Sequence, residues 1–367
     1  MNANLQESRD AKKPLRIGYI GCGFMAQKIH LPNFASLPDC QLVAIAELRR
    51  DIREDTARRF GIARQYPDHH ALLADPEVEA VALSASWAHQ GDLARDCLLR
   101  GKPVFMEKPM AVSVPQAQEI LEAERRGGGR LMVAYMKRYD AGVVLARDAI
   151  RAFRSSGELG GVTYARAHGF CGNWLAALDV PMSQSAEAYP AAPERYPAWL
   201  PGKWHRPYVE YLQQWTHNIN LLRFLLDAGD KARVRCVDLD ADGECGVTVL
   251  DLDGVRAVVE SGHVAYHGWD MFTQVYFQKG WVKTTSTPLM LRNAPEEVEI
   301  YRAVPQRSLQ QPIPEPAWSW SYKREAEEFV RCVRTGEAFA SGAADTLTDV
   351  RLFEEIYRKW LTERGEL

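Results

Sequence analysis

One stretch of the sequence has residue types and spacing suited to holding a phosphate. Gly21-Cys22-Gly23-Phe24-Met25-Ala26 reads GxGxxA directly after the apolar run 15–20. In such a run the first glycine permits a tight turn, the second lets a pyrophosphate approach the backbone, and the small last residue lets helix and strand pack closely. The positive end of the helix then faces the phosphate charge. We expect a dinucleotide here, in contact with Gly21, Gly23, Phe24 and Met25.

An acidic residue stands where ribose recognition requires one. Glu47 ends the next expected strand, 41–47, and an acid at this spacing accepts hydrogen bonds from a ribose 2′-hydroxyl. The carboxylate should repel a 2′-phosphate, so the sequence favours NAD. Arg49 and Arg50 follow closely and could clamp such a phosphate, which leaves NADP possible. The simpler interpretation makes both arginines solvated helix residues.

A lysine stands at the end of another expected strand. Glu107-Lys108-Pro109 closes the run that begins at Val104, and ligands of doubly wound sheets bind at the carboxyl ends of the strands. Lys108 there predicts an anionic or electron-rich partner, with Glu107 orienting the ammonium group. A surface ion pair is the alternative interpretation.

Apolar runs alternate with amphipathic segments from about residue 14, which predicts an α/β fold with a doubly wound parallel sheet. The expected strands are 15–20, 41–47, 79–84, 104–106 and 131–135, and the expected helices are 21–36, 49–60, 89–100 and 114–126. We expect a dinucleotide-binding domain over 14–137.

After about residue 160, strand-like runs follow one another without helices between them, which predicts a second, α+β domain over 138–367 with a large antiparallel sheet. Asp253-Gly254 and Lys279-Gly280 suit hairpin turns. The expected strands are 233–239, 246–252, 255–261, 271–278 and 281–285, and the expected helices are 208–226, 321–334 and 344–361. The aromatic-rich stretch 174–207 is expected to form an ordered lid or an oligomer contact.

Composition excludes several classes of protein. The net charge of −3 argues against nucleic acid as a partner, and no apolar run is long enough to span a membrane. The 7 scattered cysteines and the polar N-terminus predict a reduced, cytoplasmic protein. No metal is expected: His69-His70 and the Asp238-Asp240-Asp242 run are interpreted as helix-start and turn residues that no third ligand approaches.

Three motifs together resemble the Gfo/Idh/MocA oxidoreductases: the glycine run, Gly101-Lys102-Pro103-Val104 leading into Glu107-Lys108-Pro109, and the run 135–140 (YMKRYD). The resemblance extends from about residue 15 to the final helices. It implies an N-terminal Rossmann domain and a C-terminal domain whose open sheet forms a homodimer or homotetramer. It also implies an NAD(P)-dependent enzyme that moves a hydride to or from a hydroxyl or keto carbon of a sugar, an aminocyclitol or a sugar-bearing metabolite.

The resemblance assigns roles to individual residues. It implies that Lys108 contacts the reacting oxygen and the nicotinamide ribose, and that His217 takes part in proton transfer. Ser84, Trp87 and His89 fall on a loop that faces the nicotinamide half of the cofactor in the family. Further cofactor contact is expected from Glu107. The substrate is expected to meet Lys108, Tyr135, Lys137, Gln213, Gln214 and His217.

The sequence departs from the family pattern around His217. Gln213 and Asn220 stand where many members carry aspartate, so amides are expected to orient His217 in place of an Asp–His relay. Proton transfer would then be slower or would depend on Tyr135, Lys137 or Tyr139. Two other functions stay open: a non-catalytic regulator that senses dinucleotide or sugar, and a nicotinamide-dependent glycosidase.

Overall fold

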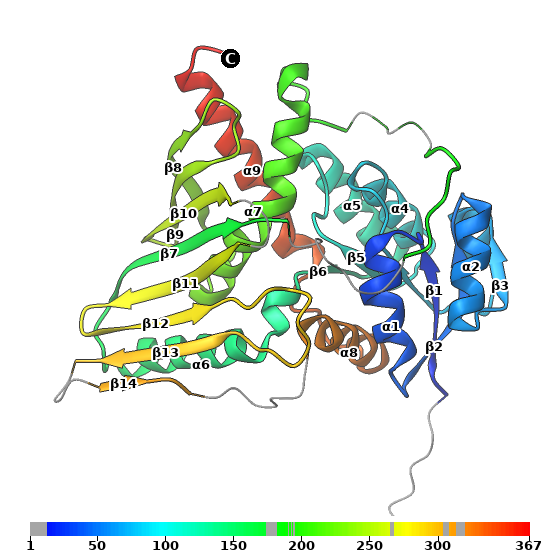
Figure 1. Ribbon diagram of the computed structural model, residues 1–367, viewed down its shortest axis with the longest axis horizontal. Helices are drawn as coiled ribbons and strands as arrows, with labels where there is room; N and C mark the ends of the chain where they lie inside the picture. The colour runs from blue at the N-terminus through cyan, green and yellow to red at the C-terminus, as the bar shows by residue number, and fades with distance from the viewer. Residues whose placement is uncertain are drawn as a thin grey trace, which may run out of the picture.

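The computed structural model describes residues 13–173, 182–189, 191, 193, 195–264, 268–303, 308–312 and 320–367. Two β-sheets, a smaller one near the N-terminus of the chain and a larger one after it, lie on opposite sides of the molecule with helices between and around them (Figure 1). Within the described ranges, no helix has the length and apolar character that crossing a membrane requires.

The first sheet has six strands in the order β3-β2-β1-β4-β5-β6, all parallel. This order, with the glycine run after β1, is the one that binds dinucleotides. The strands are β1 Leu15–Ile20, β2 Cys40–Ala46, β3 Arg64–Tyr66, β4 Ala80–Leu83, β5 Val104–Glu107 and β6 Leu131–Ala134. The expected doubly wound sheet is confirmed, and the short strand β3 was not anticipated because its three residues are exposed or half-buried and carry no apolar pattern.

Helices connect these strands in the expected alternation. A π-helical turn, Ala26–His30, leads into α1 Leu31–Ala35. The remaining helices of this part are α2 Arg50–Phe60, α3 His69–Leu73, α4 Trp87–Leu99 and α5 Val114–Gly127. The side chains buried against the sheet are mostly aliphatic, as expected for strands covered on both faces.

The second sheet has eight strands in the order β14-β13-β12-β11-β7-β10-β9-β8. It is mixed rather than purely antiparallel, because β7 pairs in parallel with β10 while the other pairs are antiparallel. The strands are β7 Val162–Cys171, β8 Ala232–Leu239, β9 Gly246–Leu252, β10 Val255–His263, β11 Trp269–Phe277, β12 Gly280–Thr285, β13 Glu297–Arg302 and β14 Ser308–Gln310.

Both expected hairpins are present, the first with the predicted turn residues and the second with its turn displaced by one position. Asp253 and Gly254 have φ values of 51° and 85°, as the turn between β9 and β10 requires. Between β11 and β12 the turn residues are Gln278 and Lys279, because Gly280 is the first residue of β12 and pairs with Phe277. A Cβ on Gly280 would lie 2.1 Å from the carbonyl oxygen of Tyr301, so close approach of the neighbouring strand requires this glycine.

Helices α6 Ala141–Ser156 and α7 His205–Leu226 pack on one face of the large sheet. The chain then returns to the first sheet. In α8 Ser321–Thr335, Phe329 packs against Phe105 of β5, and α9 Ala343–Glu363 contacts both β6 and β8. A division of the chain at residue 137 therefore stays a proposal, since the last helices pack against both sheets.

Candidate active site

A cavity of about 380 Å³ opens between the carboxyl ends of the first sheet and helix α7. Gly23, Ser84, Lys108 and His217 are among its lining residues. A second cavity of about 300 Å³ adjoins it and is lined by Gly21, Glu47 and His89, among others. The two cavities share Ala85, Ser86 and Tyr189. They form one groove along the edge of the sheet where a doubly wound fold binds its ligands.

The glycine run has the geometry that a pyrophosphate needs. Gly21 has φ of 92°, and a Cβ there would lie 2.4 Å from the carbonyl oxygen of Ser84. Gly23 differs, because no heavy atom lies within 4 Å of the position its Cβ would take. This open space faces the cavity that Phe24 and Met25 also line, so the backbone can be approached closely there. The residues fit a bound dinucleotide.

Glu47 lies just beyond β2 and is buried. Its Oε2 accepts a hydrogen bond from the backbone N of Cys22 at 2.9 Å, and its Oε1 accepts one from Nε of Arg49 at 2.9 Å. Arg49 also places its guanidinium 4.2 Å from the centre of the Tyr189 ring. The interpretation of Arg49 as a solvated residue is wrong: its side chain is 11% exposed, whereas that of Arg50 is 76% exposed.

Lys108 follows β5 directly and reaches across the cavity. Its Nζ donates a hydrogen bond to the backbone carbonyl oxygen of Gln213 in α7 at 3.0 Å. Its backbone N donates to Oε2 of Glu107 at 3.0 Å. Burial lowers the pKa of the Lys108 ammonium group, and the negative charge of Glu107 works against that shift. The hydrogen bond to Gln213 fixes the ammonium group on the wall of the cavity.

Beneath Lys108 lies a buried polar cluster that the sequence did not indicate. Nε2 of His30 lies 2.8 Å from Oε1 of Glu107, and both side chains are buried. Tyr322 and Glu325 of α8 complete the cluster, and Tyr322 also lines the cavity. Burial, followed by the charge of Glu107, raises the pKa of Glu325 well above its usual value. His30 and Glu107 are 77 positions apart in the chain and Glu325 lies still further along it, so no local sequence pattern links these residues.

His217 lies on α7 and also lines the cavity. Burial lowers its pKa well below 6.5, and the positive charges of Lys108 and Lys137 lower it further. The imidazole is therefore neutral at physiological pH and can accept a proton. Its Nδ1 has no hydrogen-bond partner among the described residues, and its ring meets that of Tyr135 edge-on, with centroids 6.4 Å apart.

The expected orientation of His217 by amide groups is not found at Asn220. Nδ2 of Asn220 donates to Oδ2 of Asp349 at 2.7 Å, and Oδ1 accepts from Nε of Arg138 at 2.6 Å. Asn220 therefore belongs to a buried network that joins α7 to α9 by way of Arg223 and Asp349, whose Nη1 and Oδ1 lie 2.6 Å apart. Of the expected amides, Gln213 lines the cavity and holds Lys108 through its backbone carbonyl.

Several predicted site residues lie outside the lining of the two cavities. Tyr135 is buried, with its hydroxyl 2.8 Å from Oγ1 of Thr216. Nζ of Lys137 lies 2.7 Å from Oε1 of Glu296, and Gln214 donates to Sγ of Cys171 at 2.8 Å. The other predicted site residues do line the cavities. Those in the first cavity are Gly23, Phe24, Met25, Ser84, Trp87, Glu107, Lys108, Gln213 and His217. Those in the second cavity are Gly21, Glu47 and His89.

The structure adds lining residues that sequence reasoning missed. Tyr189 borders both cavities, and Gln90 of α4 lines the first while donating to the carbonyl oxygen of Pro109 at 2.6 Å. Tyr189 falls in the stretch 174–207, whose aromatic content was its only signal. Within that stretch, 174–181, 190, 192 and 194 lie outside the described residues, so the expected lid stays a prediction.

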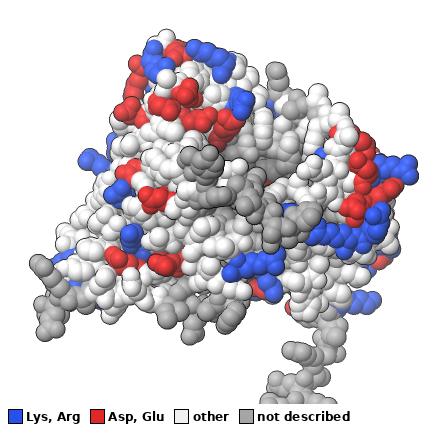
Figure 2. Space-filling view, viewed as in Figure 1, with Lys and Arg blue, Asp and Glu red and all other residues white. Residues whose placement is uncertain are grey.

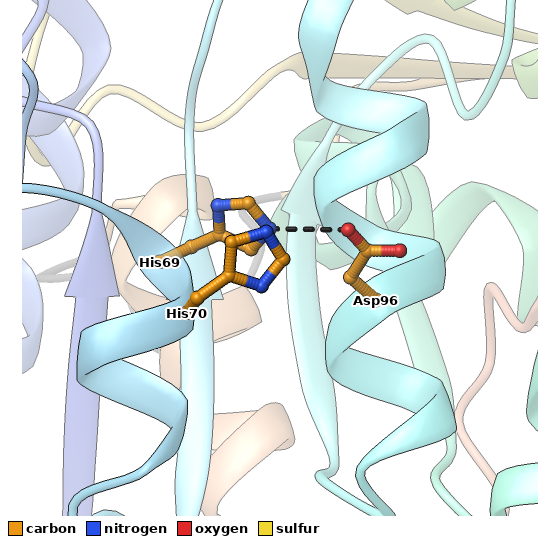
Figure 3. Close-up of side chains that lie close together, drawn as sticks. All are labelled: His69, His70 and Asp96. Carbon is orange, nitrogen blue, oxygen red and sulfur yellow. Dashed lines mark hydrogen bonds and ion pairs between the residues drawn. The ribbon is translucent and has the colours of Figure 1, made fainter.

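The expectation that no third ligand approaches His69 and His70 is wrong. Both residues begin α3, and Asp96 of α4 lies beside them (Figure 3). Each of the three offers a ligand atom, and these atoms all lie within 4.8 Å of one another. Asp96 is 26 positions beyond His70 in the chain, so only the packing of α3 against α4 brings it there.

A parallel sheet with a glycine-rich turn, beside a groove that Lys108 and His217 line, is typical of a dinucleotide-binding protein. Residues 15–135 match the family described as "Oxidoreductase family, NAD-binding Rossmann fold". Residues 15–135 are thus similar to the Gfo/Idh/MocA oxidoreductases, the family that the sequence motifs resemble.

Curated relatives match a comparable length of the chain. Inositol 2-dehydrogenase from Salmonella typhimurium is 33% identical over 149 residues, which are 40% of this chain and 43% of that relative. Myo-inositol 2-dehydrogenase from Thermotoga maritima is 29% identical over 136 residues, 37% of this chain and 40% of the relative. The aligned regions thus span less than half the length of these relatives.

Solved structures match over nearly the whole chain. A 3-ketoreductase from Actinomadura kijaniata, in complex with TDP-benzene and NADP, has a TM-score of 0.70 at 20% identity and covers 95% of this chain and 98% of its own. Levoglucosan dehydrogenase, in complex with NADH and levoglucosan, has a TM-score of 0.71 at 18% identity and covers 96% and 98%. At these identities the likeness establishes the fold.

Proposed function

We propose that the protein is an NAD(P)-dependent oxidoreductase that transfers a hydride to or from a hydroxyl or keto carbon of a sugar, an aminocyclitol or a sugar-bearing metabolite. One observation carries the proposal: Lys108 and His217 line the same cavity as the open backbone at Gly23. A dinucleotide bound at the glycine run would extend into the space that the two titratable side chains border.

The chemistry of the two side chains fits oxidation of an alcohol. When bound, the nicotinamide ring supplies or accepts the hydride. The hydroxyl proton must leave in the same reaction, and the neutral imidazole of His217 can accept it. The ammonium group of Lys108 uses one N–H on Gln213 and keeps others for the substrate oxygen, where it would stabilise developing negative charge. In the reverse reaction, reduction of a carbonyl group, the protonated imidazole of His217 would donate a proton to the substrate oxygen.

The groove favours NAD over NADP. Glu47 presents a buried carboxylate at the end of β2, beside the second cavity, and a carboxylate there accepts from ribose hydroxyls and repels a 2′-phosphate. The guanidinium of Arg49, beside that carboxylate, is already held by Glu47 and by Tyr189. Binding of a 2′-phosphate would require Arg49 to leave both partners.

The substrate class is inferred from the cavity and from the relatives. Trp87 and Tyr322 give the first cavity aromatic walls, which suit the apolar faces of a sugar ring. The curated relatives are named as inositol dehydrogenases, and the structural neighbours as a 3-ketoreductase and a levoglucosan dehydrogenase. The dehydrogenase names describe chemistry on a polyol or an anhydrosugar, and the name 3-ketoreductase describes reduction of a keto group.

The test is a titration of the purified protein with NADH and with NADPH, followed by assay of sugars, inositols and aminocyclitols with oxidised and reduced cofactor. Tight NADH binding, together with turnover that Lys108→Met removes, is the expected result. Binding of neither nucleotide would refute the proposal. Binding without turnover would favour a sensing role, and a product cleaved at its glycosidic bond without net change of cofactor would identify a glycosidase.

We further propose that the protein is a cytoplasmic homodimer or homotetramer that associates through the large sheet. The face opposite α6 and α7 carries cross-strand aromatic pairs, including Trp281 with Tyr301 at 4.1 Å and Tyr164 with Tyr276 at 6.0 Å between centroids. Figure 2 shows charged side chains of both signs, grouped most densely at the upper left and at the right, with smaller groups between them. Analytical ultracentrifugation should therefore show a mass of two or four times 41.4 kDa.

A further inference from the structure

We propose that His69, His70 and Asp96 form a binding site for a late first-row divalent metal ion such as Zn²⁺, Co²⁺ or Ni²⁺. Two imidazoles and one carboxylate are ligands that these ions accept, whereas Mg²⁺ and Ca²⁺ prefer sets made of oxygen atoms alone. The ligand atoms lie within 4.8 Å of one another. Ligands of a tetrahedral Zn²⁺ are separated by roughly 3.3 Å, so each side chain needs to move by about an ångström.

The backbone holds the two histidines on one short turn. Asp68 caps the start of α3 by accepting a hydrogen bond from the backbone N of Ala71 at 2.8 Å. The two imidazole rings lie against each other, with centroids 3.9 Å apart and an angle of 38° between their planes. Both rings point from α3 toward Asp96 on the facing helix (Figure 3). This contact places both rings on the same side of the turn, whereas adjacent residues of a helix usually point in different directions.

Asp96 is held so that one carboxylate oxygen faces the imidazoles. Its Oδ1 accepts hydrogen bonds from Nη2 and Nε of Arg95 at 3.1 Å and 3.2 Å. Its Oδ2 lies 3.1 Å from Nε2 of His69. Such outer contacts orient a metal ligand and reduce the cost of organising the site. The charge of Arg95 is offset by Asp92, 3.2 Å away, and by Glu119, 3.4 Å away.

Another histidine with acidic neighbours shows what such a site requires. His168 of β7 also contacts two carboxylates, but through opposite ring nitrogens: Nδ1 lies 2.6 Å from Glu260 and Nε2 lies 3.2 Å from Asp270. These atoms diverge around the ring and cannot meet at one ion. In the part of the chain that the structure describes, the group around His69 is the one whose donor atoms converge.

The position of the three ligands indicates that a bound metal ion would stabilise the structure or change the affinity for the dinucleotide. His69 lines the second cavity beside Glu47, while Lys108 and His217 border the first. The exposed side of His70 leaves a coordination position open to water. An ion bound here would tie α3 to α4, which together form one wall of the dinucleotide groove.

The test uses the full-length chain without a histidine tag, stripped with a chelator and carrying Cys236→Ser and Cys245→Ser to remove the two cysteines that are not buried. Co²⁺ and Zn²⁺ are titrated separately, with Mg²⁺ as a negative control. One equivalent of Co²⁺ should bind and give visible absorption bands. His70→Gln should weaken Zn²⁺ binding by about 100-fold or more, beyond the 10–100-fold typical for loss of an outer contact.

His168→Gln is the matched control and should leave metal affinity unchanged. Because His70 does not line either cavity, metal-free His70→Gln should bind NADH as the parent does, which verifies the fold. Asp96→Asn provides an independent variant on the other helix and should also weaken Zn²⁺ binding. Equal affinity in the parent and in both site variants, or no binding of one equivalent, would overturn the proposal.

Discussion

Nζ of Lys108, at the end of β5, lies 3.0 Å from the backbone carbonyl oxygen of Gln213 in α7. This hydrogen bond crosses the cavity and joins the parallel sheet to the helix that carries His217. A carbonyl acceptor does not depend on the side chain at position 213, so the position of the lysine tolerates the glutamine found there in place of aspartate. The two parts of the chain are thus connected at the point where the proposed chemistry occurs.

Replacement of Lys108 by methionine should lower kcat by about 10²–10³-fold, because it removes the cation that stabilises charge on the reacting oxygen. NADH affinity, measured by fluorescence titration, should fall much less than kcat, because Lys108 is only one of several expected cofactor contacts. Lys279→Met, at an exposed turn of the large sheet, is the matched control and should retain full activity. A Lys108→Met enzyme with undiminished kcat would show that this lysine does not act on the substrate.

The pH dependence of kcat/KM for alcohol oxidation should reflect two shifted groups. His217 must be neutral to accept a proton, and its pKa is held well below 6.5, so activity should persist below pH 6.5. Lys108 must be protonated, and its pKa is lowered from 10.5, so activity should fall on the alkaline side before pH 10.5 is reached. A profile that rises with an apparent pKa near 6.5 would place the acid limb on a different, unshifted histidine.

Replacement of Glu47 by glutamine should weaken discrimination between the two cofactors. The variant loses the negative charge that repels a 2′-phosphate and releases Arg49 from its ion pair. A hydrogen bond to a charged group contributes about 1.5–3 kcal/mol, so the ratio of NADPH to NADH dissociation constants should fall by about tenfold or more. Arg50→Gln should leave this ratio unchanged, because Arg50 is exposed and pairs with Glu54.

Glu325 should make the protein less stable as pH rises. Burial raises its pKa in the folded state above the ordinary value of 4.5. Between these two pKa values the folded state binds a proton that the unfolded state has released, so the free energy of unfolding decreases with increasing pH. Glu325→Gln should flatten the dependence of Tm on pH above 4.5. Glu327→Gln, exposed on the same helix, should leave the slope as it is in the parent.

Local patterns identified most of the elements and the phosphate-binding turn. The glycine run, the acid at the end of β2 and the lysine after β5 could be recognised because each depends on a few adjacent residues and on the end of a strand. The polar cluster of His30, Glu107 and Glu325 could not be recognised in this way. Its members come from the π-helical turn before α1, from the end of β5 and from α8, and each looks locally like an ordinary helix or strand residue.

Hydrogen-bond partners were the least predictable feature. Asn220 follows His217 by one helical turn, so the sequence placed it beside the imidazole. In the structure it bonds to Asp349 and Arg138, because the side chain points into the packing between α7 and α9. Arg49 is a comparable case, since its position at the start of α2 directs the guanidinium back onto Glu47.

Helix, strand and turn preferences act over a few residues, so local sequence patterns indicated the alternation of strands and helices, the glycine turn and the residue types at the strand ends. Which side chains meet depends instead on how the whole chain packs. Packing brought Gln213 to Lys108, turned Asn220 toward Asp349 and placed Asp96 beside His69 and His70. Distance, burial and pKa depend on neighbours from remote parts of the chain, and those neighbours are set when the helices pack on the two sheets.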